Sequence, residues 1–144
     1  MTQATSVSLR IYHEDTDSGG VVYHANYLRY MERARTEWLL AQGFDHERIE
    51  QDYGILFVVR SVNIKYLRPA RLGDYLQAWA EPQSLRRGLL TFEQSVRRAE
   101  EVLAHAIVRV ISVSLKDFRS TEVPPDLVRS FGLQPLTPPF VPLA

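Results

Sequence analysis

The feature that most constrains the fold is one long amphipathic helix, expected from about Ala25 to Gln42. Apolar and aromatic side chains recur there at spacings of three and four, so they share one helix face. These residues are Tyr23, Tyr27, Tyr30, Met31, Ala34, Trp38 and Ala41. Gly43 is well placed to end the helix. At about 1.5 Å per residue the helix can cross a small domain, so we expect it to be central.

Extended segments lie on both sides of this helix. Val7, Leu9 and Ile11 alternate with polar residues, which predicts a strand that ends near Tyr12. Four further strands are expected at residues 58–66, 75–84, 89–97 and 102–115. The links at residues 86–88 and 99–100 are short enough to join only antiparallel neighbours. We therefore predict an α+β domain in which a curved five-stranded antiparallel sheet wraps the long helix.

Shorter helices are expected at residues 45–51 and 126–131, the second with Pro125 in its first turn. Six of the eight prolines lie between Pro124 and Pro142, which predicts an irregular, proline-rich tail from about residue 124. We expect residues 1–144 to form a single domain. Long strands leave an unpaired sheet edge in so small a domain, so we also expect a homodimer at least.

Composition excludes several classes of protein. The 17 basic and 17 acidic side chains cancel, so no overall field attracts nucleic acid or an anionic membrane. The absence of cysteine excludes disulfide scaffolds, thiolate nucleophiles and thiolate metal sites. Residues 1–10 lack an export-signal pattern, and no segment approaches the roughly 18 apolar residues of a spanning helix. We expect a cytoplasmic protein without stable membrane insertion.

The segment that can carry chemistry is the polar stretch before the long helix, residues 12–27, YHEDTDSGGVVYHANY. Backbone N–H groups in the first turn of a helix lack intrahelical partners and bind anions, including an oxyanion that forms in a transition state. Asp17 can act as nucleophile or general base on a thioester, with the backbone N–H of His24 facing the carbonyl oxygen. Gly19 and Gly20 allow a sharp turn and close approach of substrate.

Simpler explanations of this segment exist. Asp and Ser are ordinary residues before a helix, and Gly-Gly is an ordinary turn. Asp15, Asp17 and Gly20 fit the start of a calcium loop, but Gly19 and Asn26 replace required ligands. No two histidines have metal-ligand spacing, and there is no phosphate-binding glycine loop. We therefore expect no metal and no cofactor.

Charged residues elsewhere have less specific patterns. Arg29, Glu32, Arg33 and Thr36 lie away from the aromatic stripe, as on a solvated helix face, and Arg33 and Glu37 have the spacing of a helical ion pair. Arg86 and Arg87 in a hairpin turn, with Lys65 and Lys116, can hold coenzyme A phosphates or remain solvated.

The segment from Tyr12 to Trp38, YHEDTDSGGVVYHANYLRYMERARTEW, closely resembles thioesterases related to 4-hydroxybenzoyl-CoA thioesterase. It is most similar to the branch of acyl-CoA thioesterases associated with the Tol-Pal system of Gram-negative bacteria. Residues 57–76 resemble the second strand and following turn of that family, through Val59-Arg60-Ser61, Tyr66, Pro69-Ala70 and Gly73-Asp74. The resemblance covers roughly residues 6–118, with the motifs in the right order.

This resemblance implies a hot-dog fold, a homodimer or homotetramer, and active sites between subunits. By position in the motif, the catalytic aspartate falls on Asp17 and the oxyanion donor on the backbone N–H of His24. Tyr23 and His24 match residues that line the site, and Gly19, Gly20 and Val21 are expected to contact substrate. The implied activity is cofactor-free hydrolysis of acyl-CoA, and of acyl carrier protein thioesters as a further option.

Three alternatives remain open at this point. A second hot-dog branch uses a glutamate on the central helix, which here would be Glu32 or Glu37. A non-catalytic acyl-CoA or acyl carrier protein binding scaffold would not need the Asp17 motif. A hot-dog hydratase would need a different acid–base pair, for which the sequence offers no candidate.

Overall fold

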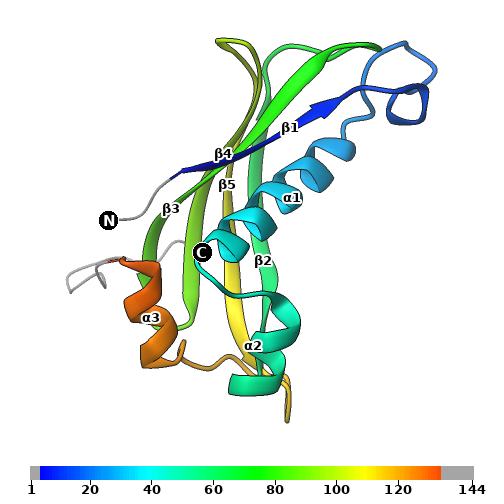
Figure 1. Cartoon of the computed structure of the whole chain (residues 1–144). Helices are drawn as coiled ribbons and strands as arrows, with labels where there is room; N and C mark the ends of the chain where they lie inside the picture. Colours follow the sequence, from blue (N-terminus) through cyan, green and yellow to red (C-terminus); the bar gives the residue numbers. More distant parts are fainter. Residues whose placement is uncertain (1–3, 134–144) are drawn as a thin grey trace.

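The aromatic stripe forms one helix, α1, which lies against the concave face of a curved sheet (Figure 1). The computed structural model describes residues 4–133, so the end of the proline-rich tail lies outside the described residues. The elements in chain order are β1 (Thr5–Arg10), the 3-10 turn η1 (His13–Asp15), α1 (Asn26–Ala41), α2 (His46–Tyr53), β2 (Ile55–Tyr66), β3 (Tyr75–Arg86), β4 (Leu89–Arg98), β5 (Glu101–Ser114) and α3 (Pro125–Phe131).

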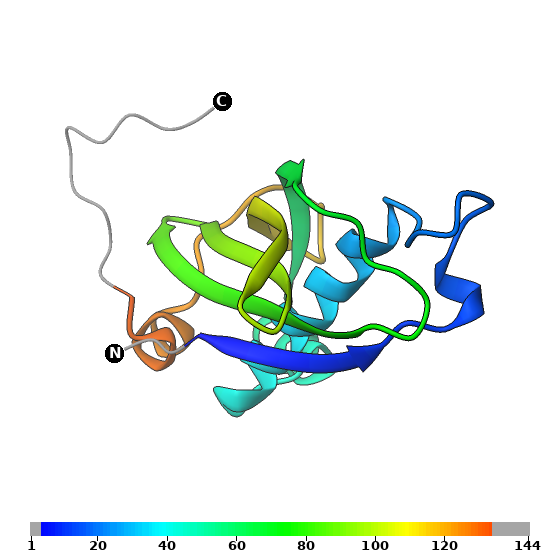
Figure 2. The ribbon, with the colours of Figure 1, turned by 90° about the horizontal axis from the view of Figure 1, so that it is seen from above.

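The strands form one antiparallel sheet of five in the order β1-β3-β4-β5-β2. Seen from above, the sheet curves around α1 (Figure 2). This is the hot-dog arrangement that the resemblance implies, and it confirms the predicted α+β fold. The two hairpins, β3–β4 and β4–β5, are the antiparallel neighbours that their short links require.

The stripe on α1 packs into the sheet because its side chains face one direction. Tyr27, Tyr30, Met31, Ala34 and Trp38 are all buried. The rings of Trp38 and Phe92 meet edge to face, with centroids 5.2 Å apart, and this contact joins α1 to β4. The prediction was wrong at the two ends of the stripe. Tyr23 precedes the helix and is 47% exposed, and Ala41 in the last turn is exposed as well.

The other face of α1 is only partly solvated. Arg29, Glu32 and Arg33 are exposed, as expected, and so is Glu37. The spacing of Arg33 and Glu37 does not produce an ion pair in the described structure, because the Arg33 guanidinium lies over the Tyr30 ring, 5.6 Å from its centroid. Thr36 is half-buried rather than solvated.

Several element boundaries differ from the predicted ones by a few residues. Helix α2 continues to Tyr53, where Gly54 adopts a left-handed conformation (φ 66°) and ends it. Strand β2 then begins directly at Ile55, three residues before the alternating pattern. The first strand ends at Arg10, because residues 13–15 form a 3-10 turn that the sequence pattern did not predict.

The sheet has two open edges, β1 and β2. The longest strand, β5, is interior, and the longer of the two edge strands is β2, with 12 residues. Its pairing with β5 is interrupted by a bulge between Val59 and Ser61. Val59, Val62 and Tyr66 are 49%, 38% and 45% exposed on this strand. An edge of this length with exposed apolar side chains is suited to pairing with another chain.

The link between β2 and β3 is held by Asp74. Its carboxylate accepts hydrogen bonds from the backbone N–H of Arg71 at 2.8 Å and from the Arg98 guanidinium at 2.7 Å. Burial alone would raise the pKa of Asp74, but these two hydrogen bonds outweigh it and lower that pKa. The ionised carboxylate therefore ties the link to the end of β4.

We predict that Asp74→Asn lowers the free energy of unfolding by about 1–3 kcal/mol at pH 7, because it weakens a charge-assisted hydrogen bond. The pKa of Asp74 is lower in the folded protein than in the unfolded chain, where it is near 3.8. The ionised carboxylate therefore stabilises the folded state fully above that unfolded-state pKa, and this stabilisation is lost as pH falls through the folded-state pKa. Urea titrations from pH 7 to pH 2 should show the difference from wild type shrinking below about pH 4. Exposed Asp52→Asn is the control, and an equal cost there would contradict the account.

Candidate functional site

The loop from Asp15 to His24 is anchored to α1 through Asp15. The Tyr30 hydroxyl donates to the Asp15 carboxylate at 2.7 Å, and the backbone N–H of Tyr12 donates to its other oxygen at 2.8 Å. The backbone N–H of Tyr23 and the side-chain amide of Asn26 donate to the Asp15 carbonyl oxygen, at 2.9 and 3.0 Å. Both ends of the loop therefore meet at one residue.

Burial, followed by the hydrogen bond to Asp15, raises the pKa of the Tyr30 hydroxyl. The hydroxyl is thus a donor that keeps its proton at neutral pH. The sequence analysis missed Asp15, Asn26 and Tyr30 as parts of the site. A signal was available, because buried tyrosine hydroxyls require hydrogen-bond partners.

Asp17 lies at the exposed tip of this loop. Its carboxylate accepts a hydrogen bond from the backbone N–H of Gly19 at 2.8 Å. Its own N–H donates to the Val21 carbonyl at 2.9 Å, and its carbonyl accepts from the N–H of Gly20 at 3.0 Å. Gly20 has φ of 80°, a conformation that favours glycine. These bonds fix the backbone under an ionisable side chain that remains open to solvent.

The loop is also paired with the link before β3. Val21 bridges Arg71, and the N–H of Val22 donates to the Ala70 carbonyl at 2.9 Å. Val21 is therefore half-buried, and its backbone is used within the chain. The Asp17 tip rests on a two-sided support, with α1 on one side and this link on the other.

His24 lies at the start of α1, among aromatic rings. Its ring is 4.7 Å from that of Tyr23 and 6.1 Å from that of Tyr66, between centroids. The Tyr66 hydroxyl donates to the His24 carbonyl oxygen at 3.0 Å. In the described residues no group accepts a hydrogen bond from the backbone N–H of His24. The geometry leaves the His24 N–H, directly before the cap of a 16-residue helix, available to an anion.

This loop combines a carboxylate with a backbone donor at a helix start. A carboxylate can attack a carbonyl carbon or take a proton from water, and an N–H at a helix start can hydrogen-bond a developing oxyanion. The six residues predicted for this part of the site, Asp17, Gly19, Gly20, Val21, Tyr23 and His24, all lie in this loop and the turn before α1.

The predicted anion-binding residues lie elsewhere. Arg86 and Arg87 line a hollow at the β3–β4 turn together with Arg60 from the β2 bulge. The Asp17 loop pairs with the link before β3, and this turn follows the end of β3, 12 residues along, so the two lie at opposite ends of the strand. Lys65 does not join the hollow, because it pairs with His105 towards the other end of β5.

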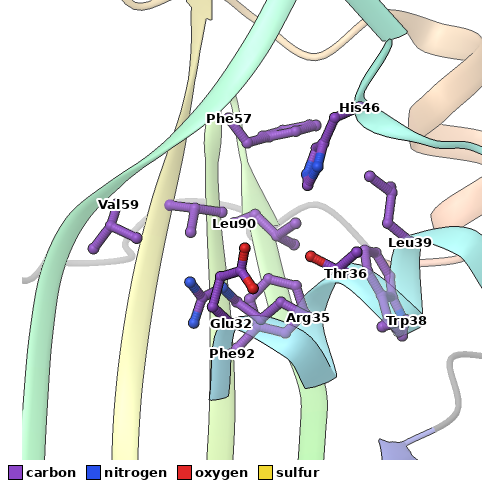
Figure 3. A pocket seen from close by; sticks show the side chains of 11 residues that line it. Glu32, Arg35, Thr36, Trp38, Leu39, His46, Phe57, Val59, Leu90 and Phe92 are labelled. Carbon is purple, nitrogen blue, oxygen red and sulfur yellow. The ribbon is translucent and has the colours of Figure 1, made fainter. Parts of the chain in front are cut away.

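The two helix glutamates have different surroundings. Glu32 lines a cavity of about 180 Å³ between α1, α2 and the concave face of the sheet (Figure 3). Glu37 is exposed and does not line it. The cavity walls include Arg35, which the sequence analysis did not single out. Arg35 belongs to neither the apolar stripe nor the solvated face, so periodicity gave no signal for it.

Residues 4–133 contain no group of three or more His, Asp or Glu side chains able to hold a metal ion. They also contain no helix long and apolar enough to cross a membrane.

Comparisons with known proteins identify the family. Residues 19–105 match the thioesterase superfamily. The chain is 36% identical over 126 residues to an acyl-CoA thioesterase, YbgC, of Haemophilus influenzae, covering 88% of this chain and 93% of that protein. It is 40% identical over 124 residues to the acyl-CoA thioester hydrolase YbgC of Escherichia coli, covering 85% and 92%. A crystal structure of a probable thioesterase from Bartonella henselae superposes with a TM-score of 0.79 at 30% identity, covering 85% of this chain and all (100%) of that one.

We predict that Tyr30→Phe loosens the loop, because the Asp15 carboxylate loses its partner on α1. The free energy of unfolding should fall by about 1–3 kcal/mol. Amide hydrogen exchange should accelerate at residues 17–24 more than in β5. Tyr53→Phe removes the same hydroxyl from α2, where the structure gives it no hydrogen bond. Identical exchange patterns in the two variants would show that the Tyr30 hydroxyl does not anchor the loop.

Proposed function

This chain belongs to the thioesterase superfamily, and we propose that it hydrolyses acyl-CoA thioesters to a free acid and coenzyme A, with Asp17 as the catalytic carboxylate. The observation that carries the assignment is the loop itself. It presents an exposed carboxylate at a fixed turn and, at its other end, an N–H without a partner in the described structure. This is the pair of groups that acyl transfer to water requires.

The reaction can follow two routes from this geometry. As general base, Asp17 takes a proton from water while the water oxygen attacks the thioester carbon, and the proton later passes to the leaving thiolate. As nucleophile, Asp17 forms an acyl anhydride and releases the thiolate, and water then cleaves the anhydride. In both routes negative charge develops on the carbonyl oxygen, where the backbone N–H of His24 donates to it.

We propose that two copies complete the site through the β2 edge. Tyr66, whose hydroxyl contacts His24, lies at one end of β2, and the arginine-lined hollow reaches β2 at Arg60, in the half of the strand nearer Ile55. Antiparallel pairing of β2 with its copy places the Ile55 half of one copy opposite the Tyr66 half of the other. The partner subunit's basic hollow then approaches the Asp17 loop of the first chain. A homodimer, or a homotetramer of two such pairs, follows from this arrangement.

The basic hollow is suited to the phosphates of coenzyme A. Three arginines line it, and guanidinium groups bind phosphate oxygens in pairs. Gly88 is required there, because a Cβ on it would lie 2.3 Å from the Thr121 carbonyl oxygen. An acyl group carried on acyl carrier protein presents the same thioester, so that protein is a second candidate substrate. A cytoplasmic location is part of the same proposal.

The test of the catalytic assignment is thiol release from short, medium, long and aromatic acyl-CoAs. We predict that Asp17→Asn lowers kcat by about a hundred- to ten-thousandfold, as expected for loss of a general base or nucleophile. Glu37→Gln, another exposed carboxylate, should leave kcat within about twofold. If Asp17→Asn keeps full activity and Glu32→Gln loses it, the chemistry belongs to the helix glutamate. If no substrate releases thiol, the chain is a binding protein.

The phosphate assignment has its own test. Arg86→Gln combined with Arg87→Gln should raise KM for acyl-CoA about tenfold or more and leave kcat nearly unchanged, because ground-state contacts are lost. A thioester of N-acetylcysteamine with the same acyl group has no phosphates and serves as the matched substrate. Its kcat/KM should not change in the double variant, and an equal loss for both substrates would refute phosphate recognition.

A further inference from the structure

The cavity on α1 has apolar walls from the helix and the sheet. They include Leu39 from α1, Phe57 from β2 and Phe92 from β4 (Figure 3). Its volume of about 180 Å³ is slightly larger than the roughly 150 Å³ cavity known to bind benzene in an engineered protein. One aromatic ring or a short acyl chain therefore fits inside.

The cavity also contains a half-buried cation. Arg35 is the one Arg or Lys among its lining residues. Burial lowers the pKa of its guanidinium. The guanidinium donates a hydrogen bond to a neutral acceptor, the side-chain oxygen of Gln94, at 2.9 Å. No carboxylate in the described residues forms an ion pair with it within 4.0 Å.

Gln94 holds that guanidinium in place. It is 1% exposed, and its amide nitrogen donates to the carbonyls of Met31 at 2.9 Å and Trp79 at 3.2 Å. Its oxygen is thereby directed to Arg35. The cation is pre-organised by a neutral group, which leaves guanidinium N–H groups for a further acceptor.

Trp38 lines the same cavity. Trp38 is 1% exposed, and its indole N–H has no hydrogen-bond partner in the described structure. Trp38 follows Arg35 by three residues on α1, so the two side chains are neighbours on the helix surface. An unpaired buried donor is costly, and a buried charge without an anion is costlier still.

We propose that this cavity binds small carboxylic acids, with the carboxylate at Arg35 and the apolar body between α1 and the sheet. The inference stands apart from the Asp17 chemistry, because Arg35 is on the helix and not in the loop. Such a ligand pairs the Arg35 guanidinium and fills the apolar space. Glu32 lines the cavity too and is the nearest acidic neighbour of Arg35, so it weakens the binding of an anion.

The first test is calorimetric titration of the full chain with benzoate and with benzamide. They share a ring of the right size, but only benzoate is charged. We expect benzoate to bind about ten- to a hundredfold more tightly, as for one charge-assisted hydrogen-bonded contact. Equal affinity, or no binding of either, overturns the proposal without any variant.

Substitutions in and near the cavity then test where the ligand binds. Arg35→Gln should weaken benzoate binding tenfold or more, and Glu32→Gln should strengthen it several-fold. Arg29→Gln removes an exposed charge from the same helix and should change nothing. If Arg35→Gln does not fold, Val110→Phe, which fills the cavity wall, should abolish binding. Unchanged binding in a folded Arg35 or Val110 variant contradicts the site.

Two sources can supply such a carboxylate: a released acid, or the far end of an acyl group. The second source is tested by comparing the hydrolysis of adipoyl-CoA with that of hexanoyl-CoA. This comparison rests on the proposed function. If the cavity takes the acyl end, Arg35→Gln lowers kcat/KM for adipoyl-CoA tenfold or more relative to hexanoyl-CoA. If benzoate binds at Arg35 but this ratio is unchanged, the ligand is a released acid.

Discussion

The candidate site depends on the hydrogen bond from the Tyr30 hydroxyl to the Asp15 carboxylate. Tyr30 belongs to the buried stripe of α1, so its position is fixed by core packing. Asp15 in turn fixes the loop, because its carbonyl oxygen also accepts hydrogen bonds from the backbone N–H of Tyr23 and the side-chain amide of Asn26. The Asp17 tip is exposed, yet its backbone is held by hydrogen bonds to Gly20 and Val21. A flexible surface carboxylate would not keep one orientation, and catalysis depends on orientation.

The curved sheet separates the two halves of the proposed chemistry. The Asp17 loop and the arginine hollow lie at opposite ends of β3, so one chain cannot apply both to the same small substrate. Strand β2 is an open edge that runs between these two ends. In the proposed dimer, pairing along this edge covers apolar side chains and unites the halves. The proposal thus assigns one edge two roles, association and the completion of a site between subunits.

Most of the fold could be predicted from periodicity. The spacing of Tyr27, Tyr30 and Trp38 identified α1, and the short links identified the two hairpins, because both depend on local patterns. Strand order could not be read, since the pairing of β2 with β5 joins residues far apart in sequence. In the site, the motif located Asp17 and His24. Arg35 and Gln94 were missed because their role comes from a cavity that only tertiary packing creates.

The most direct test of a site divided between two copies is subunit mixing. Asp17→Asn protein and the Arg86→Gln, Arg87→Gln double variant are unfolded together, refolded, and assayed at low acyl-CoA concentration. In a mixed dimer one site receives both defects and the other receives none. Activity of about a quarter of wild type is expected from random pairing, well above either variant alone. A mixture whose activity is only the average of the two variants would contradict the account.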